Sequence, residues 1–278
     1  KKPLDMGRLN LIVTEACEGF PGVEIKTVIK ETQNNLFDGI DEIDVAKALV
    51  MSARTLIEQD PDYSYVAAGL LLDQLRQEAL TFIEGKKTQA TQKEMKERYQ
   101  DYFQKYIERG AELELLDQEL TKYDLNRLSK ALKPERDRQF TYLGLQTLYD
   151  RYFIHSMDIR FELPQTFFMR VAMGLAINEL DRDRHAIEFY ELLSSFNFMS
   201  STPTLFNSGT CRPQLSSCYL TTIPDDLDGI FSAIKDDALL SKFAGGLGND
   251  WTPVRALGTH IKGTNGKSQG VVPFLKVA

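Results

Sequence analysis

The sequence contains little cysteine and histidine, three residues of each, and a single tryptophan. The cysteines, Cys17, Cys211 and Cys218, lack both the C-x-x-C spacing of zinc sites and the dense pattern of secreted disulfide scaffolds. We therefore expect a cytoplasmic protein whose thiols stay reduced. No histidine is spaced from a serine or cysteine in a way that supports a catalytic triad.

Long apolar runs and an excess of positive charge are also lacking. No stretch is apolar over the length of a membrane span, and Lys1-Lys2-Pro3 leads into an amphipathic segment rather than the apolar core of a signal peptide. The 40 Asp and Glu residues outnumber the 33 Lys and Arg residues, which gives a net charge of -7 and argues against a broad nucleic-acid-binding face. We expect neither a membrane nor a nucleic acid as partner.

The composition that is present is typical of a globular protein. With 42% hydrophobic and 26% charged residues, a chain of 278 residues can bury a large core in one or two domains. The sequence does not begin with methionine, and residues 270–275 are typical of the entry to buried structure close to its end. We expect a piece of a longer protein, cut at both ends.

Helical periodicity runs through the first two thirds of the sequence. Apolar residues recur at helical spacing in residues 6–16, 45–53 and 63–83, and the polar stretch 84–88 is the best linker, so residues 1–85 are predicted to form one helical unit. The periodicity resumes near Tyr99 and includes a helix that begins at Pro164, which predicts a second helical domain over residues 86–198.

From Ser200 onward, glycine and proline separate short β-prone pieces such as residues 218–223. The predicted fold is therefore α+β and mostly α, with residues 199–278 beginning an α/β domain. The Gly266-Lys267-Ser268 triplet is not a P-loop, because Ile261 stands where that motif requires glycine. Glycines and nearby cations still leave two interpretations of residues 245–270, a phosphate-binding loop or a surface loop.

Two hydroxyls and a thiol adjoin in the Ser216-Ser217-Cys218 triplet, where a loop leads into a predicted strand. Functional residues often lie at such junctions, and only the thiol could carry out redox chemistry. The alternative is that Cys218 packs as a small hydrophobic residue, as free cysteines commonly do.

Several blocks of sequence resemble, in order, the start of the catalytic barrel in the large subunit of class I ribonucleotide reductases. The first is Met-Ser-Ser-Thr-Pro-Thr-Leu-Phe-Asn-Ser-Gly-Thr at residues 199–210. Further blocks lie at residues 212–218, 225–230, 241–242, 244–248, 254–258 and 261–267. Residues 1–198 resemble the family's ATP-cone and helical domain more weakly, through Asp60-Pro-Asp-Tyr63 and the order of the helices.

The resemblance implies a ten-stranded α/β barrel that residues 199–278 would begin, a helical domain at residues 86–198 and a partial ATP-cone at residues 1–85. It also implies an oxidoreductase of deoxyribonucleotide biosynthesis. Such an enzyme reduces ribonucleoside diphosphates to deoxyribonucleoside diphosphates by thiyl-radical chemistry with a redox cysteine pair.

The resemblance assigns substrate and redox roles. Thr202 and Ser217 match positions that hold the substrate, and short hydroxyl side chains approach phosphate closely without adding charge. Cys218 matches one half of the redox pair that supplies two electrons when the ribose 2′-hydroxyl leaves. Neither of the other cysteines matches its disulfide partner, and the radical-forming cysteine would lie beyond Ala278. The chain alone is therefore expected to be inactive.

An allosteric site for deoxynucleoside triphosphates is also implied. A carboxylate can accept hydrogen bonds from deoxyribose, while cations and loop amides meet the phosphates. In the family this site lies at a dimer interface, built partly by the helix that corresponds to residues 226–243. An apolar stripe on that helix, which equally fits a core-facing helix, consists of Leu227, Ile230, Ile234 and Leu239. The matching site residues are Asp225, Asp226, Leu227, Lys242, Arg255, Lys262 and Gly263.

The implied partners are a second large subunit in a homodimer, a small subunit whose metallocofactor generates the radical, and thioredoxin or glutaredoxin as electron source. No metal or cofactor is expected to bind directly to this chain, apart from dNTP and ATP effectors. One alternative is a B12-dependent reductase, which shares the barrel but needs no small subunit. Another is a non-catalytic nucleotide-binding regulator, which would have no use for the substrate and redox blocks of residues 199–278.

The ATP-cone that the resemblance implies departs from the family pattern. After Asp38-Gly39-Ile40, binding cones place a threonine and then a histidine one turn later, where this chain has Glu42 and Ala46. Where a phosphate-binding lysine is expected, Gln77-Glu78 follow Arg76. We expect a degenerate cone that no longer binds nucleotide, and the alternative is a working cone with substituted contacts.

Overall fold

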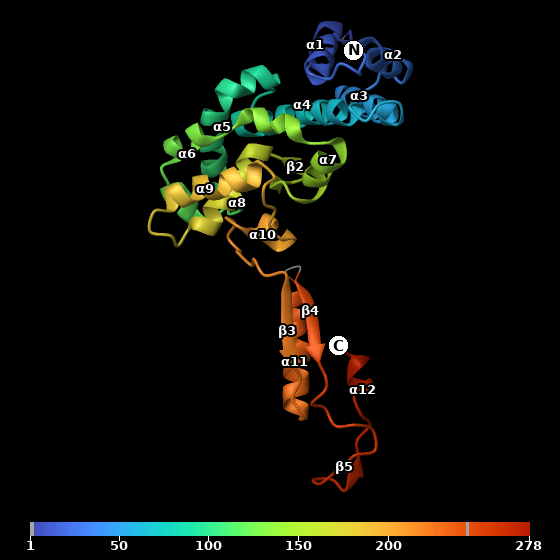
Figure 1. Cartoon of the computed structure of the whole chain (residues 1–278), viewed down its shortest axis with the longest axis vertical. Coiled ribbons are helices and arrows are strands. Elements are labelled where there is room, and N and C mark those ends of the chain that lie inside the picture. The colour runs from blue at the N-terminus through green and yellow to red at the C-terminus, as the bar shows by residue number, and fades with distance from the viewer. Residues whose placement is uncertain (1–2, 243–244) are drawn as a thin grey trace. The chain divides into compact units, whose positions relative to one another are not determined.

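The structure, a computed structural model, describes residues 3–242 and 245–278. The chain is mostly helical, at 59%, with a few short strands, so the predicted α+β, mostly α fold is confirmed. It divides into two compact units, a helical unit of Lys1–Met199 with Gly209–Cys211 and a mixed unit of Ser200–Ser208 with Arg212–Ala278. Figure 1 labels their elements. None of the helices in the described ranges is both long enough and apolar enough to span a membrane.

The first helices of the helical unit assemble around α4. This helix has twelve buried residues and packs against α1 and α3. It ends where Gly85 adopts a left-handed conformation, with φ of 68°, and donates its N–H to Thr81. The elements are α1 (Met6–Cys17), α2 (Ile25–Asn34), α3 (Glu42–Thr55), the 3₁₀ turn η1 (Leu56–Glu58) and α4 (Tyr63–Glu84).

The rest of the helical unit is built on α5, which packs against α4, and on the pair α8 and α9. A capping box between Thr91 and Glu94 begins α5, and Pro164 begins α8, which packs against α9 and is buried along most of its length. The elements are α5 (Gln92–Glu112), η2 (Gln118–Lys122), α6 (Leu125–Ala131), η3 (Pro134–Gln139), α7 (Tyr142–Arg151), the hairpin β1 (His155–Ser156) and β2 (Ile159–Arg160), α8 (Pro164–Ala176) and α9 (Arg182–Ser194).

Charged groups lie at the centre of the helical core. Glu162 and Arg170 are both fully buried, and the Nε of Arg170 lies 2.7 Å from Glu162. The Tyr106 hydroxyl donates a further hydrogen bond to the same carboxylate. Breaking such a pair by removing one partner costs about 3 to 5 kcal/mol of stability, because the other charge is left buried and uncompensated.

A second buried network surrounds Asp137. The Tyr99 hydroxyl donates to its carboxylate at 2.6 Å and the Gln165 amide at 2.8 Å, and the Tyr190 hydroxyl in turn donates to Gln165 at 2.7 Å. Burial raises the pKa of Asp137 to about 6, although both hydrogen bonds oppose that rise. The network joins α5, η3, α8 and α9 through one ionisable group.

The mixed unit is built on one parallel strand pair. Strand β3 pairs in parallel with β4, from Cys218 opposite Gly246 to Thr222 opposite Asp250, and α11 connects the two. Ile223, Ile230 and Ala233 form its small core. The elements are α10 (Thr202–Asn207), β3 (Cys218–Thr222), α11 (Leu227–Ser241), β4 (Gly246–Asp250), the hairpin β5 (His260–Ile261) and β6 (Gly266–Lys267), and α12 (Val272–Leu275).

Several predicted elements are confirmed. The helices expected at residues 6–16, 45–53 and 63–83 are α1, α3 and α4, and the helix expected to begin at Pro164 is α8. The helix expected over residues 226–243 is α11, except that residue 243, like the Ala244 that opens one motif block, lies outside the described residues. The division into three domains at residues 85 and 198 stays a prediction.

The raised pKa of Asp137 predicts a pH-dependent stability. Because the pKa of the folded state, about 6, exceeds the ordinary 3.8, the stability that the neutral carboxyl contributes is full below pH 3.8 and is lost as the pH rises through 6. Relative to Asp137→Asn, the free energy of unfolding should therefore fall by about 2 to 3 kcal/mol from about pH 4 to about pH 7. Urea denaturation at several pH values measures it.

A matched control is Asp101→Asn, which removes an exposed carboxylate on α5. That variant should show no comparable pH dependence relative to the native protein. If the difference in the free energy of unfolding between the native protein and Asp137→Asn stayed constant over the same pH range, the prediction would be contradicted.

Candidate functional site

Parallel pairing brings the segments that follow β3 and β4 to one edge of the strand pair. Asp225 follows β3 and Arg255 follows β4. The backbone N–H of Arg255 donates to the Asp225 carboxylate at 3.0 Å, and its Nε donates to the two carboxylate oxygens at 3.0 and 2.8 Å. Two of the predicted effector residues, 30 positions apart in the sequence, are therefore in direct contact.

The electrostatics of this pair favour the ionised carboxylate. The hydrogen bond from the Arg255 backbone, together with the Arg255 side-chain hydrogen bond and charge, holds the pKa of Asp225 below its ordinary value. About a third of each side chain remains exposed, 36% for Arg255 and 34% for Asp225. A ligand can therefore reach both groups. A phosphate bound there would share the Arg255 guanidinium with the Asp225 carboxylate, which already orients it.

Asp226 begins α11. Its carboxylate accepts the backbone N–H of Gly229 at 2.8 Å, which makes it the N-cap of the helix. A side chain at Gly229 would clash with the Pro224 ring, since an added Cβ would lie 2.1 Å from its Cγ. The sharp turn from β3 into α11 thus depends on glycine at position 229. Leu227, the first residue of the helix, is 65% exposed.

The other predicted effector residues lie on exposed segments. Lys242 is the C-cap of α11, and Lys262 and Gly263 lie in the turn between β5 and β6. In the described part of the chain, neither Lys262 nor Gly263 makes a hydrogen bond with the Asp225–Arg255 pair. The structure therefore brings Asp225 and Arg255 together, whereas among the described residues the hairpin turn is not hydrogen-bonded to them.

Ser217 and Cys218 lie at the opposite end of β3. Both are exposed, Cys218 is a free thiol, and the Ser217 hydroxyl lies 3.7 Å from its Sγ. Across the strand pair stands Gly246, where an added Cβ would lie 4.0 Å from Sγ. Four strand steps of about 3.3 Å put Cys218 about 13 Å from the last residue of β3. The predicted redox residue and the Asp225–Arg255 pair therefore lie at opposite ends of the strand pair.

Short side chains fix the segment that leads into β3. Thr204 donates to the Leu215 carbonyl at 3.2 Å, and Asn207 donates to the Gln214 carbonyl at 2.8 Å. Both donors lie on α10, which begins at Thr202. These bonds hold the helix that carries one predicted substrate residue, Thr202, beside the segment that leads to the other, Ser217.

The sequence analysis missed a buried link between α11 and β4. Asp237 is 8% exposed, and the Asn249 amide donates to its carboxylate. Asp237 follows Ile230 by seven residues and so lies on the same face of the helix. An acidic residue on this apolar face was the feature of the sequence that could have predicted the link. The expected stripe is only partly in the core, since Ile230 and Ile234 pack there while Leu227 and Leu239 are exposed.

Within residues 3–242 and 245–278, no group of three or more His, Cys, Asp or Glu residues is placed to hold a metal ion.

The thiol of Cys17 is buried in the helical unit, and burial raises its pKa to about 11, which makes it a poor nucleophile.

Family comparisons match both units. The family model described as "Ribonucleotide reductase, all-alpha domain" matches residues 138–213, and that described as "Ribonucleotide reductase, barrel domain" matches residues 216–278. A "Ribonucleoside-diphosphate reductase subunit alpha" of Chlamydia muridarum is 48% identical over 95% of this chain and 25% of that protein. The chain belongs to the ribonucleotide reductase large-subunit family.

Other relatives agree with that membership. The subunit alpha of Helicobacter pylori is 38% identical over 100% of this chain and 34% of its own length. A "Ribonucleoside-diphosphate reductase large subunit" of Plasmodium falciparum is 35% identical over 88% of this chain and 29% of its own length. The chain thus spans a quarter to a third of these relatives. The resemblance to the ribonucleotide reductase family is confirmed. Thr202 lies within the match to the all-alpha domain, and Ser217, Cys218 and the effector residues lie within the match to the barrel domain.

Proposed function

We propose that this chain is part of the catalytic large subunit of a ribonucleoside-diphosphate reductase, which converts ribonucleoside diphosphates to deoxyribonucleoside diphosphates. The observation that carries the proposal is the exposed Cys218 thiol beside the Ser217 hydroxyl, where the first strand of the barrel match begins. The printed names of the relatives, reductase alpha and large subunits, support it.

Cys218 would act as one of two reducing thiols. Two thiols become one disulfide, and the two electrons and two protons released replace the ribose 2′-hydroxyl by hydrogen, with loss of water. The second thiol and the radical-forming cysteine would lie outside this chain. A small subunit with a metallocofactor would supply the radical, and thioredoxin or glutaredoxin would reduce the disulfide. The chain alone would therefore be inactive.

Substrate would be held by Thr202 and Ser217, whose hydroxyls can donate to a diphosphate or ribose without adding charge. The bonds from α10 to Gln214 and Leu215 support this pairing, because they fix the two hydroxyl-bearing segments to one another.

The end of β3 and β4 would bind a deoxynucleoside triphosphate effector. The ionised Asp225 carboxylate can accept a hydrogen bond from deoxyribose, and the exposed part of Arg255 can donate to phosphate. Asp226, Leu227, Lys242, Lys262 and Gly263 would complete the site. Exposed apolar residues on α11, Leu227, Phe231 and Leu239, support a homodimer in which this helix meets a second copy.

Residues 1–85 would form a degenerate ATP-cone, followed by a helical domain at residues 86–198 and the barrel start at residues 199–278. Arg76 is 2% exposed and donates to the Ala90 carbonyl at 3.0 Å and to Gln92 at 2.8 Å, so this cation supports structure rather than phosphate binding. Glu42 is exposed and paired with Lys87. A carboxylate near a triphosphate adds repulsion of about 1 kcal/mol.

The redox role of Cys218 predicts the behaviour of Cys218→Ser in the full-length protein. Turnover of a nucleoside diphosphate with a dithiol reductant should be abolished, because no disulfide forms, while thermal unfolding stays unchanged. The matched control is Cys211→Ser, which replaces the other exposed thiol by a hydroxyl that can keep its hydrogen bond to the Leu116 carbonyl, and it should keep turnover within about twofold of native, as expected for a surface substitution. Multiple turnovers by Cys218→Ser at the native rate would refute the role.

The effector site predicts weaker nucleotide binding in Arg255→Ala. Loss of a charge-assisted phosphate contact, worth roughly 1.5 to 3 kcal/mol, should lower dTTP affinity of the full-length protein by about tenfold or more, as measured by calorimetry. Lys276→Ala, which removes an exposed cation near α12, serves as control and should bind dTTP normally. Unchanged affinity in Arg255→Ala would move the site elsewhere.

The degenerate cone predicts that dATP does not bind within residues 1–85. We expect 8-azido-dATP, photolysed with the full-length protein while dTTP saturates the effector site, to label no peptide from this range. Labelling of the effector site in the absence of dTTP is the positive control. A saturable, micromolar label on a peptide that contains residues 38–46 would show that the substitutions are tolerated.

A further inference from the structure

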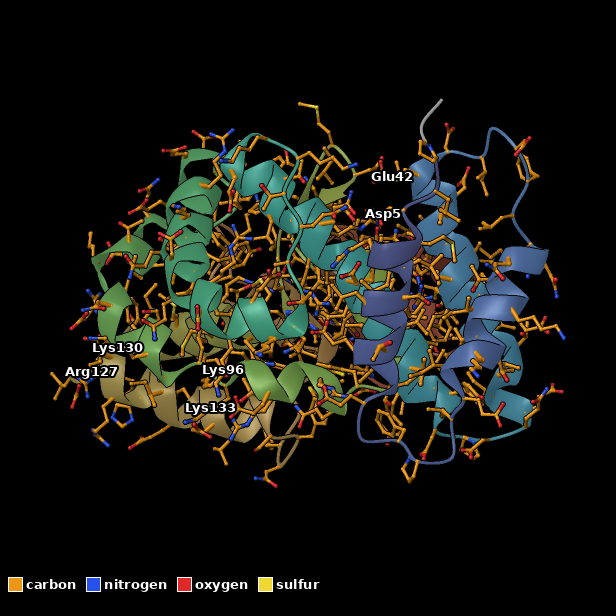
Figure 2. The ribbon with its side chains drawn as sticks, turned by 90° about the horizontal axis from the view of Figure 1, so that it is seen from above. Asp5, Glu42, Lys96, Arg127, Lys130 and Lys133 are labelled. Atoms are coloured by element: carbon orange, nitrogen blue, oxygen red, sulfur yellow. The ribbon has the colours of Figure 1, made fainter. Side chains whose placement is uncertain are left out.

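One face of the helical unit gathers positive charge on an otherwise acidic chain. Lys96 lies on α5, Arg127 and Lys130 lie on α6, and Lys133 follows α6; we call these four residues the basic face. Figure 2 shows all four on the same side of the unit. Helix α6 packs against α5, and Gln92, one turn before Lys96, donates to the carbonyl of Pro134 at 2.8 Å. These contacts bring the two helices and the segment after α6 together.

The cations of the basic face are not held in ion pairs among the described residues, although Arg127 lies near the Asp181 carboxylate. Among the described residues, none of their side chains forms a hydrogen bond or an ion pair, and all are exposed except the half-buried Lys133. Several neighbouring cations are paired instead, in Lys105–Asp101, Arg109–Glu112, Lys122–Glu119 and Arg182–Glu119.

The spacing of two of these cations works against the helix that carries them. Arg127 and Lys130 are three residues apart on α6, where like charges weaken a helix by a few tenths of a kcal/mol. A carboxylate within ion-pairing distance of these two cations would relieve the repulsion. The paired cations of α5 have such a carboxylate. The unrelieved charge is therefore better explained by something that the face contacts outside this chain.

We propose that the basic face docks an acidic peptide segment of a partner protein. Charge complementarity carries the proposal, since guanidinium and ammonium groups that are not held in internal ion pairs bind carboxylates of a second chain. The seven residues of α6 span about 10 Å, which suits a short segment with several acidic side chains.

Flanking carboxylates favour a short peptide over a nucleic acid. Asp124 caps α6, Glu135 lies exposed beyond Lys133, and Asp181 is close enough to Arg127 for its pKa to be affected. A long polyanion that continued past the face would meet these groups and the net charge of -7. The cations also stand on helices rather than around a loop of free amides, so the face lacks the cradle that small phosphates prefer.

The inference is independent of the proposed reductase activity, because it concerns side chains of the helical unit alone. A surface of this kind raises the association rate and orients the partner, and both effects weaken as salt screens the charges.

The test measures binding of fluorescein-labelled hexaglutamate to the full-length protein by fluorescence anisotropy at low ionic strength. We expect Arg127→Glu/Lys130→Glu to weaken binding by about tenfold or more, since two attractions become repulsions. Lys105→Glu/Arg109→Glu is the matched control: it changes the net charge equally on α5 but replaces cations that are already paired. That variant should bind within about twofold of native, as expected for screened charges away from the site.

Several outcomes would overturn the proposal. Equal losses in the two double variants would show that overall charge, rather than the basic face, governs binding. Tighter binding of hexathymidylate or of tripolyphosphate than of hexaglutamate would assign the face to a different class of ligand. Should the charge-reversed protein fail to fold by circular dichroism, the neutral Arg127→Gln/Lys130→Gln variant takes its place, and hexaglutamate should protect residues 125–133 of the native protein from hydrogen exchange.

Discussion

The parallel pairing of β3 with β4 determines where the main candidate residues of the mixed unit, Asp225, Arg255, Ser217 and Cys218, lie. Parallel strands require a crossover, here α11, and they place the segments that follow both strands at one edge. Asp225 and Arg255 consequently meet, whereas Ser217 and Cys218 lie at the opposite edge. Ligands of open α/β sheets gather at the carboxyl edge, which is where Asp225 and Arg255 of the proposed effector site lie.

Buried charge gives the helical unit its specificity. The Glu162–Arg170 pair and the Asp137 network each connect segments that are distant in sequence, with hydrogen bonds of defined direction. Apolar packing alone would accept many helix registers, but a buried carboxylate is tolerated only where its donors are in place. The same requirement makes Asp137 sensitive to pH, since its pKa of about 6 lies close to neutrality.

Periodicity predicted most of the long helices, but α2 was missed. Helix α4 buries twelve residues and was expected, whereas α2, which buries only Val28 and Thr32, was not predicted although Ile25, Val28 and Ile29 follow helical spacing. The contact of Asp225 with Arg255 could not be derived from spacing, because it depends on strands that pair across a whole helix. The resemblance to reductases named both residues but did not indicate that they bind one another.

That contact changes how an effector would gain affinity at Arg255. A free arginine loses roughly 2 kcal/mol of rotamer freedom when it is fixed on a phosphate. Here Asp225 has already fixed the guanidinium through its Nε, at 2.8 Å, so most of that entropy is lost before a ligand arrives. The phosphate must then share the cation with a carboxylate, which reduces its electrostatic gain. The pair therefore favours selectivity in the position of the phosphate over raw affinity, because only a ligand that leaves Asp225 bonded keeps the benefit of the ordered side chain.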